Sequence, residues 1–202
     1  LTTTTTSQSA STNNNTNTTA VSKPGTKIWN YIDYNNANTV AQAMINNNTI
    51  YGTTKSGLIT GTQWDTIMNW YQNAEIKVDK TQDWGTYRDF TYSGNGKYFS
   101  YSGSDPTIWS EGTFTRTGNN DGSSYPFYYH ASGLNTNGIK KNIADLGGNV
   151  WEWTAEKYTN SCIFRGGSAN NTTVDWPSIY RGDGNNDYVS CGIGFRVALY
   201  IQ

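Results

Sequence analysis

The 202-residue chain is predicted to fold as an α+β domain with few short helices, short antiparallel strands and long ordered loops. Three observations predict this class. Helical periodicity occurs in two short stretches of the first half, and the last third carries strand patterns. Between them, residues 79–138 are dense in Gly, Ser, Asn and Tyr without sustained periodicity, which predicts loops with short strands. A hydrophobic fraction of 35% supplies one core of ordinary size, so one main domain is expected.

Residues 1–22, rich in Thr, Asn and Ser, have almost nothing to bury and are predicted to be a flexible linker. The linker is expected to tether a domain that covers residues 23–202. Because the sequence does not begin with Met, we expect a fragment or a processed form, whose export signal or anchor would lie outside it.

Two amphipathic helices are predicted, at residues 39–46 and 62–73. Their apolar faces are Val40, Ala43 and Met44 in the first helix, and Trp64, Ile67, Met68 and Tyr71 in the second. Both helices are expected to pack into the core.

Strands are predicted at residues 149–154, 161–168 and 193–201. If the last two run antiparallel side by side, Cys162 and Cys191 are displaced along them. The pair is then expected to miss the Cα separation of about 5.5 Å that a disulfide needs.

Composition excludes some partners. The net charge is −1 and charged residues make up 14% of the chain, so no basic field would attract nucleic acid. No apolar run approaches the roughly 18 residues that cross a bilayer, so direct membrane insertion is not expected.

The motif IADLGGNVWEWTAEKY at 143–158 places Trp151 and Trp153 on one face of a strand and Glu152 on the other. Two interpretations stay open. Asp145, the carbonyls of Gly148 and Val150, and Glu152 could converge on a calcium ion, which takes oxygen ligands. Alternatively, the Gly-Gly pair forms a turn and Glu152 pairs with an arginine such as Arg165 or Arg196.

The motifs LGGNVWEWTAE, FRGGS and GIGFRVAL, in this order, resemble the C-terminal half of the formylglycine-generating enzyme (sulfatase-modifying factor) family. GLITGTQWDTIMNWYQN resembles the family's helix more weakly. The resemblance implies a C-type-lectin-like fold over residues 23–202, in which the strands carrying RGGS and GFRVAL pair. It also implies a structural calcium at the four residues named above, although no cofactor is expected to be required.

The resemblance does not extend to the catalytic residues. The two copper-binding cysteines of the enzymes fall near Asn171 and Trp176, and neither can replace a thiolate. A related branch binds iron through three histidines, but this chain has only His130, expected to be a loop side chain. The protein is therefore predicted not to be an enzyme.

The spacing RGG, nine residues, Pro177, three residues, Arg181, eleven residues, IGFRVAL resembles the variable proteins of diversity-generating retroelements. By this resemblance, template AAC codons become NNC codons, which never encode Trp, Met, Lys, Glu or Gln. Between Ser168 and Gly192 every residue except Trp176 is an allowed outcome. Trp176, Pro177 and Arg181 would then be fixed positions in a variable region of about 165–199.

The chain is therefore predicted to display a mutable ligand- or receptor-binding surface on a rigid frame, extracellularly, on a phage tail or a bacterial surface. Its partner is expected to be a protein or glycan on a cell surface. The predicted contact residues are Ala169, Asn170, Asn171, Val174, Asp175, Ser178, Ile179, Tyr180, Asp183, Asn185, Asn186, Asp187, Tyr188 and Ser190. Two alternatives stay open: an oxidase-like enzyme with a degenerate or unrecognised active site, and a carbohydrate-binding module with an invariant loop.

Overall fold

The computed structural model describes residues 15–18, 20–46, 53–103, 108–118 and 125–201. Most of the predicted linker lies outside the described residues. Ala20, near its end, is buried in the main core cluster, so the packed domain includes a residue ahead of the predicted boundary.

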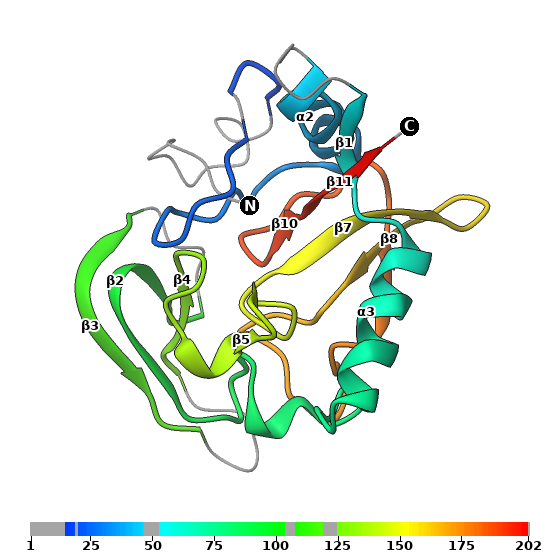
Figure 1. Ribbon diagram of the computed structural model, residues 1–202. Helices are drawn as coiled ribbons and strands as arrows, with labels where there is room; N and C mark the ends of the chain where they lie inside the picture. The colour runs from blue at the N-terminus through cyan, green and yellow to red at the C-terminus, as the bar shows by residue number, and fades with distance from the viewer. Residues whose placement is uncertain (1–14, 19, 47–52, 104–107, 119–124, 202) are drawn as a thin grey trace.

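Two α-helices, two short 3₁₀ helices and eleven strands make up the described part of the chain (Figure 1). The helices are α2 (Tyr34–Asn46), α3 (Gly61–Asn73), η2 (Thr81–Asp83) and η3 (Thr136–Gly138). The strands are β1 (Thr54–Leu58), β2 (Tyr92–Tyr101), β3 (Ser110–Arg116), β4 (Phe127–His130), β5 (Ile139–Lys140), β6 (Ile143–Ala144), β7 (Trp151–Lys157), β8 (Cys162–Arg165), β9 (Arg181–Gly184), β10 (Ile193–Phe195) and β11 (Val197–Ile201). This content confirms the α+β class.

The central sheet has the order β10-β7-β8-β9. Strand β7 pairs in parallel with β10 on one edge and antiparallel with β8 on the other. The resemblance had implied that the strands carrying RGGS and GFRVAL pair. They do not, because β7 lies between them. The predicted strand 193–201 is also divided at Arg196, and its second part, β11, pairs with β1.

Helix α3 confirms the predicted helix at 62–73. The Thr60 hydroxyl accepts a hydrogen bond from the Gln63 amide, and the Gln63 side chain accepts one from the Thr60 amide, which completes a capping box. Trp64, Met68 and Tyr71 are buried against the core, as their spacing predicts.

Helix α2 begins five residues earlier than predicted and buries a different face. The Asp33 carboxylate accepts a hydrogen bond from the Asn36 amide at 2.8 Å, which caps the earlier start. Its buried side chains are Tyr34, Ala37, Val40, Ala41 and Ile45, whereas Ala43 is exposed and Met44 is half-buried.

A three-stranded antiparallel sheet, β3-β2-β4, occupies the region predicted to be mostly loops. Its alternation is hidden by Gly94 and Gly96 in β2. A Cβ at Gly94 would lie 2.6 Å from the Phe114 ring, and one at Gly96 would lie 2.7 Å from a Leu134 methyl. These glycines make room for neighbouring side chains and do not mark turns.

The WEW motif lies in β7 as predicted. Trp151 and Trp153 join the main core cluster with Phe164, and Glu152 is buried on the opposite face. Both cysteines, at positions 162 and 191, are free and buried in different core clusters, which agrees with the expectation that they do not pair.

Candidate functional site

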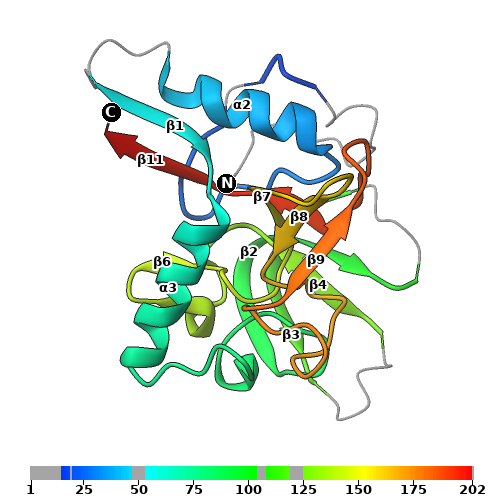
Figure 2. The same ribbon diagram turned by 90° about the vertical axis from the view of Figure 1, so that its right-hand side faces the viewer.

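The segment 168–192 leaves β8, makes a series of turns, forms β9 and returns to β10 (Figure 2). It is therefore not one free loop. Strand β9 pairs with β8 along its whole length, with Arg181 opposite Arg165 and Gly184 opposite Cys162. The sequence RGDG of β9 carries no apolar alternation, so its strand character could not be predicted.

Two predicted contact residues, Ala169 and Ser178, lie in the interior and are both 0% exposed. The Ser178 hydroxyl donates to the Val78 carbonyl at 3.0 Å, and the Ser178 carbonyl accepts from the Trp64 indole at 2.9 Å. For these two positions the predicted surface role was wrong, because both side chains are buried in the interior of the domain.

Other residues of the segment are also held by the frame. The Thr173 amide and hydroxyl both donate to the Asp89 carboxylate. A Cβ at Gly182 would lie 2.2 Å from the Phe164 ring, so a larger residue there would displace a core aromatic. The indole of Trp176, expected to be fixed, packs edge to face against Trp151 at 5.9 Å.

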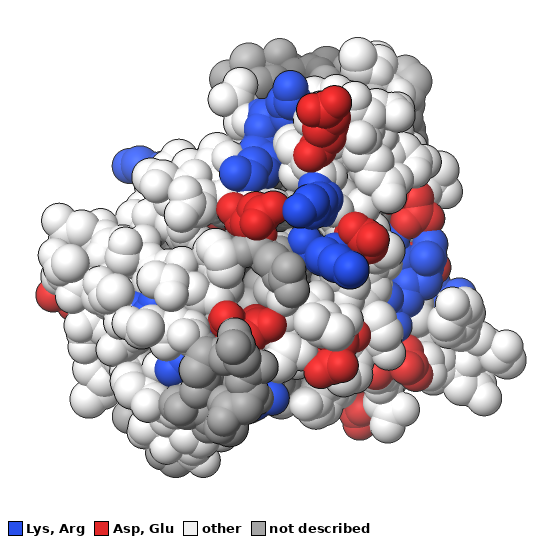
Figure 3. Space-filling view, turned by 90° about the horizontal axis from the view of Figure 1, so that it is seen from below, with Lys and Arg blue, Asp and Glu red and all other residues white. Residues whose placement is uncertain are grey.

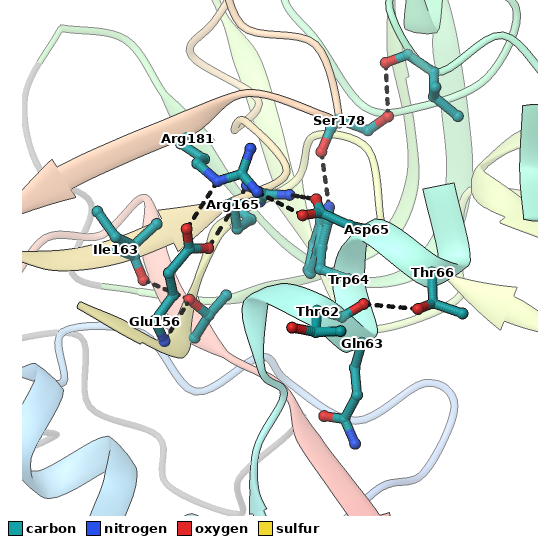
Figure 4. Close-up of polar contacts among 12 residues, drawn as sticks. Thr62, Gln63, Trp64, Asp65, Thr66, Glu156, Ile163, Arg165, Ser178 and Arg181 are labelled. Atoms are coloured by element: carbon teal, nitrogen blue, oxygen red, sulfur yellow. Dashed lines mark hydrogen bonds and ion pairs between the residues drawn. The ribbon is translucent and has the colours of Figure 1, made fainter. Parts of the chain in front are cut away.

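A network of four charged side chains joins the segment to the frame (Figure 4). Arg181 of β9 donates to Asp65 of α3 at 2.5 Å and to Glu156 of β7 at 2.8 Å. Arg165, which is 0% exposed, also pairs with both carboxylates. Burial lowers the pKa of Arg165, and the neighbouring guanidinium of Arg181 lowers it further, while the two carboxylates oppose this shift.

This charged network gives Arg181 a structural role, which agrees with its predicted status as a fixed position. Two arginines share two carboxylates that come from two other elements, so no ligand is needed to balance their charge.

The other predicted contact residues reach the surface. Ten are exposed: Asn170, Val174, Asp175, Ile179, Tyr180, Asp183, Asn185, Asn186, Asp187 and Tyr188. Asn171 and Ser190 are half-buried. Within the described residues, the side chains of Asn170, Asn185, Asn186 and Tyr188 make no hydrogen bond. Their replacement would therefore remove no polar contact from the fold.

A pocket of about 320 Å³ opens within this surface, and we call it the aromatic pocket. The segment supplies seven of its lining residues: Ser168, Asn170, Asn171, Tyr188, Ser190, Cys191 and Gly192. The frame supplies the rest, notably Tyr101, Tyr129, Trp151, Phe164 and Ile193. Sequence reasoning missed Tyr101 and Tyr129, because they arrive from β2 and β4 of the unpredicted sheet.

The face of the molecule seen in Figure 3 is largely uncharged. In Figure 3, Lys and Arg side chains lie beside Asp and Glu side chains and do not gather by sign. This distribution agrees with the low charge content of the sequence and gives that face no basic patch for phosphates.

Of the residues implied to hold calcium, Asp145, Val150 and Glu152 line one small cavity, but Arg196 lines it too and pairs with the Glu152 carboxylate. Both Glu152 oxygens accept from Arg196, at 2.7 Å from Nε and 2.6 Å from Nη2. Asp145 accepts from the Gly133 amide through Oδ2, while Oδ1 is buried without a hydrogen bond. The structure thus bears out the interpretation that Glu152 pairs with an arginine, and that arginine is Arg196 rather than Arg165.

The positive charge beside Glu152 is the Arg196 guanidinium. Desolvation lowers the pKa of Arg196, but Glu152, followed by Asp145, outweighs this effect and raises the pKa above its ordinary value. A dication at Glu152 would have to displace a bidentate, largely buried ion pair.

We therefore expect calcium to leave the stability of the protein unchanged. After treatment with a chelator, addition of calcium should shift the melting temperature by less than about 1 °C, because no bound ion adds free energy to the folded state. Differential scanning calorimetry with magnesium as the matched control measures the shift. A calcium-specific rise of several degrees would contradict this assignment.

No group of three or more His, Cys, Asp or Glu side chains in the described ranges is placed to hold a metal. His130, expected to be a loop side chain, ends strand β4 and is 0% exposed. Its ring nitrogens contact the Thr86 hydroxyl and the Ala131 carbonyl. Across the same ranges, no helix has the length and apolar character to span a bilayer.

A family model for the sulfatase-modifying factor enzyme 1-like domain matches residues 85–201, which is more than half of the chain. No curated protein matches the sequence. Several solved structures are similar, including the following two. The crystal structure of CarF is 15% identical with a TM-score of 0.38, over 73% of this chain and 48% of that one. Treponema denticola variable protein 1 is 14% identical with a TM-score of 0.39, over 74% and 49%. The chain thus spans about half the length of each.

Proposed function

The chain belongs to the sulfatase-modifying factor enzyme 1-like domain family, with a C-type-lectin-like α+β fold. We propose that it is nevertheless a non-enzymatic ligand-binding protein. Its binding surface consists of the exposed residues of segment 168–192 and the aromatic pocket among them. We further propose that retroelement-directed mutation diversifies this surface, and that the protein is displayed on a phage tail or a bacterial surface.

One observation carries the proposal: the segment divides sharply into held and free positions. Thr173, Ser178 and Gly182 are buried and fitted to the frame, whereas Asn170, Asn185 and Tyr188 are exposed and their side chains make no hydrogen bond. A surface that must change while its fold stays constant needs this division.

The chemistry of the free positions supports binding. Tyr180 and Tyr188 are 38% and 49% exposed and offer large, rigid contact areas with few rotatable bonds. Asn and Ser side chains around them can donate and accept hydrogen bonds in many geometries. This mixture is typical of antibody contact loops.

The non-enzymatic part of the proposal rests on particular residues. The family's copper-binding cysteine positions fall near Asn171 and Trp176. Asn171 is instead used to accept two hydrogen bonds from Ser168, through its amide and its hydroxyl. Metal analysis of the purified protein tests this part, because stoichiometric copper or iron would favour an enzyme.

A pair of matched libraries tests the binding surface. The first replaces the codons of Asn170, Asn185, Asn186 and Tyr188 by NNC. The second does the same for Ala169, Thr173, Ser178 and Gly182. We expect most members of the first library to fold and most of the second to fail, because only the second disturbs buried contacts.

Display of both libraries with a conformation-sensitive protease selection measures the folded fraction. The folded members of the first library should also yield binders when selected on an arbitrary immobilised target. Equal survival of the two libraries would defeat the division into held and free positions.

A further inference from the structure

The aromatic pocket differs from the rest of the proposed binding surface in being concave and uncharged. Assuming the proposed function, we propose that this pocket binds one neutral sugar unit of a glycan. Its volume of about 320 Å³ is at the lower end of the roughly 300–1,000 Å³ usual for ligand pockets. A protein partner would instead cover about 800 Å² of surface on each side, most of it outside a pocket of this size.

The absence of charged residues from the lining restricts the ligand. None of the residues that line the pocket is charged: Tyr101, Tyr129, Trp151, Phe164, Ser168, Asn170, Asn171, Tyr188, Ser190, Cys191, Gly192 and Ile193. A carboxylate, sulfate, phosphate or ammonium group entering it would lose water without gaining a counter-charge, which is costly. The part of the ligand that enters must therefore be neutral.

The polar groups of the lining favour hydroxyls. Ser168 donates to Asn171 Oδ1 from both its amide and its hydroxyl, at 2.9 Å each, so Oδ1 is occupied and the side-chain NH₂ is left to donate. Ser190 Oγ accepts from the Gly192 amide at 3.2 Å and keeps its own proton to donate. Asn170 adds a free amide that both donates and accepts.

Neighbouring sugar hydroxyls, each a donor and an acceptor, match this set of neutral groups. An apolar ligand would bury the same groups without partners, which costs free energy for each.

Aromatic rings supply the remaining walls; Tyr101 and Tyr188 are partly open to solvent, while Tyr129, Trp151 and Phe164 are buried behind them. The Tyr101 ring is held by stacking on Phe127 at 4.9 Å. Trp151 is held by edge contacts with Phe164 and Tyr180, at 5.0 and 6.1 Å. Tyr188 passes close to Gly184, where an added Cβ would lie 3.4 Å from its Cδ1. The electron-rich face of such a ring attracts the weakly positive C–H face of a sugar.

A glycan array probed with the purified full chain, followed by titration of hits with the free neutral saccharides, tests the proposal. Tyr188→Ala and Asn170→Ala remove one wall and one amide of the pocket. Tyr158→Ala is the matched control, because Tyr158 is 59% exposed and does not line the pocket. Thermal melts confirm that all variants fold.

We expect binding to at least one neutral glycan, weakened about 10-fold or more by Tyr188→Ala and unchanged by Tyr158→Ala. The proposal is overturned if no neutral glycan binds, if only charged glycans or proteins bind, or if both tyrosine variants behave alike. In those cases the matched libraries decide separately on the proposed function, since tolerance of the free positions does not depend on the ligand being a sugar.

Discussion

Trp153→Ala should destabilise the protein by about 3–5 kcal/mol, the largest effect expected for a single truncation in the core. The Trp153 indole is 0% exposed and donates a hydrogen bond to the Ile32 carbonyl at 3.0 Å. Its ring also packs edge to face with Tyr34 and Phe164. Truncation would leave a cavity between α2 and the central sheet and an unpaired Ile32 carbonyl.

Urea unfolding followed by circular dichroism measures this loss of unfolding free energy. The matched control is Trp70→Ala, because Trp70 is 46% exposed on α3 and its truncation should cost about 0.5 kcal/mol or less. Equal losses for the two variants would show that the central sheet is not the rigid frame assigned here.

Arg196→Met should also cost about 3–5 kcal/mol, because it leaves the Glu152 carboxylate buried without its partner. The Glu152 side chain is 5% exposed and both its oxygens accept from Arg196. The Arg196 guanidinium also donates to the Ala144 carbonyl at 2.8 Å, and thereby joins β6 to β7. The variant would thus lose a charge pair and a contact between elements.

The double variant Glu152→Gln with Arg196→Met should recover part of the lost stability, because it removes the unpaired charge. Lys77→Met is the control for an exposed ion pair with Asp83 and should change the unfolding free energy by less than about 1 kcal/mol. If Arg196→Met cost no more than Lys77→Met in urea unfolding, the buried ion pair would have no structural role.

Sequence patterns predicted the elements whose signals are local. Helix α3 was placed correctly, because Trp64, Met68 and Tyr71 recur at helical spacing. Strands β7 and β8 were found from the WEW and FRGG motifs. The start of helix α2 was predicted five residues too late. Its cap residue, Asp33, precedes the apolar pattern that predicted the helix.

Features that depend on distant segments could not be predicted. Gly94 and Gly96 made β2 resemble a loop, and only the folded structure shows Phe114 and Leu134 beside them. The sequence left both Arg165 and Arg196 open as partners of Glu152. In the structure Arg165 pairs with Asp65 of α3 and Arg196 pairs with Glu152, and the position of Asp65 depends on how α3 packs.

For the candidate site, the sequence indicated the segment but not its internal division. Ala169 and Ser178 are small residues like their exposed neighbours, so composition gave no sign that they are buried. Three of the twelve residues that line the aromatic pocket, Tyr101, Tyr129 and Ile193, lie in strands that pair with neither β8 nor β9. The sequence of the segment therefore gave no sign of Tyr101 and Tyr129.

Deep sequencing of the 3′ end of the gene across a population of its source, with the flanking DNA, tests most directly that the exposed surface is diversified. We predict substitutions at the codons of exposed residues such as Asn170, Asn185 and Tyr188, matched to adenines in a nearby near-identical repeat. Thr173, Ser178 and Gly182 should stay constant. An invariant 3′ end without a repeat, or variation that falls equally on buried and exposed positions, would contradict the account.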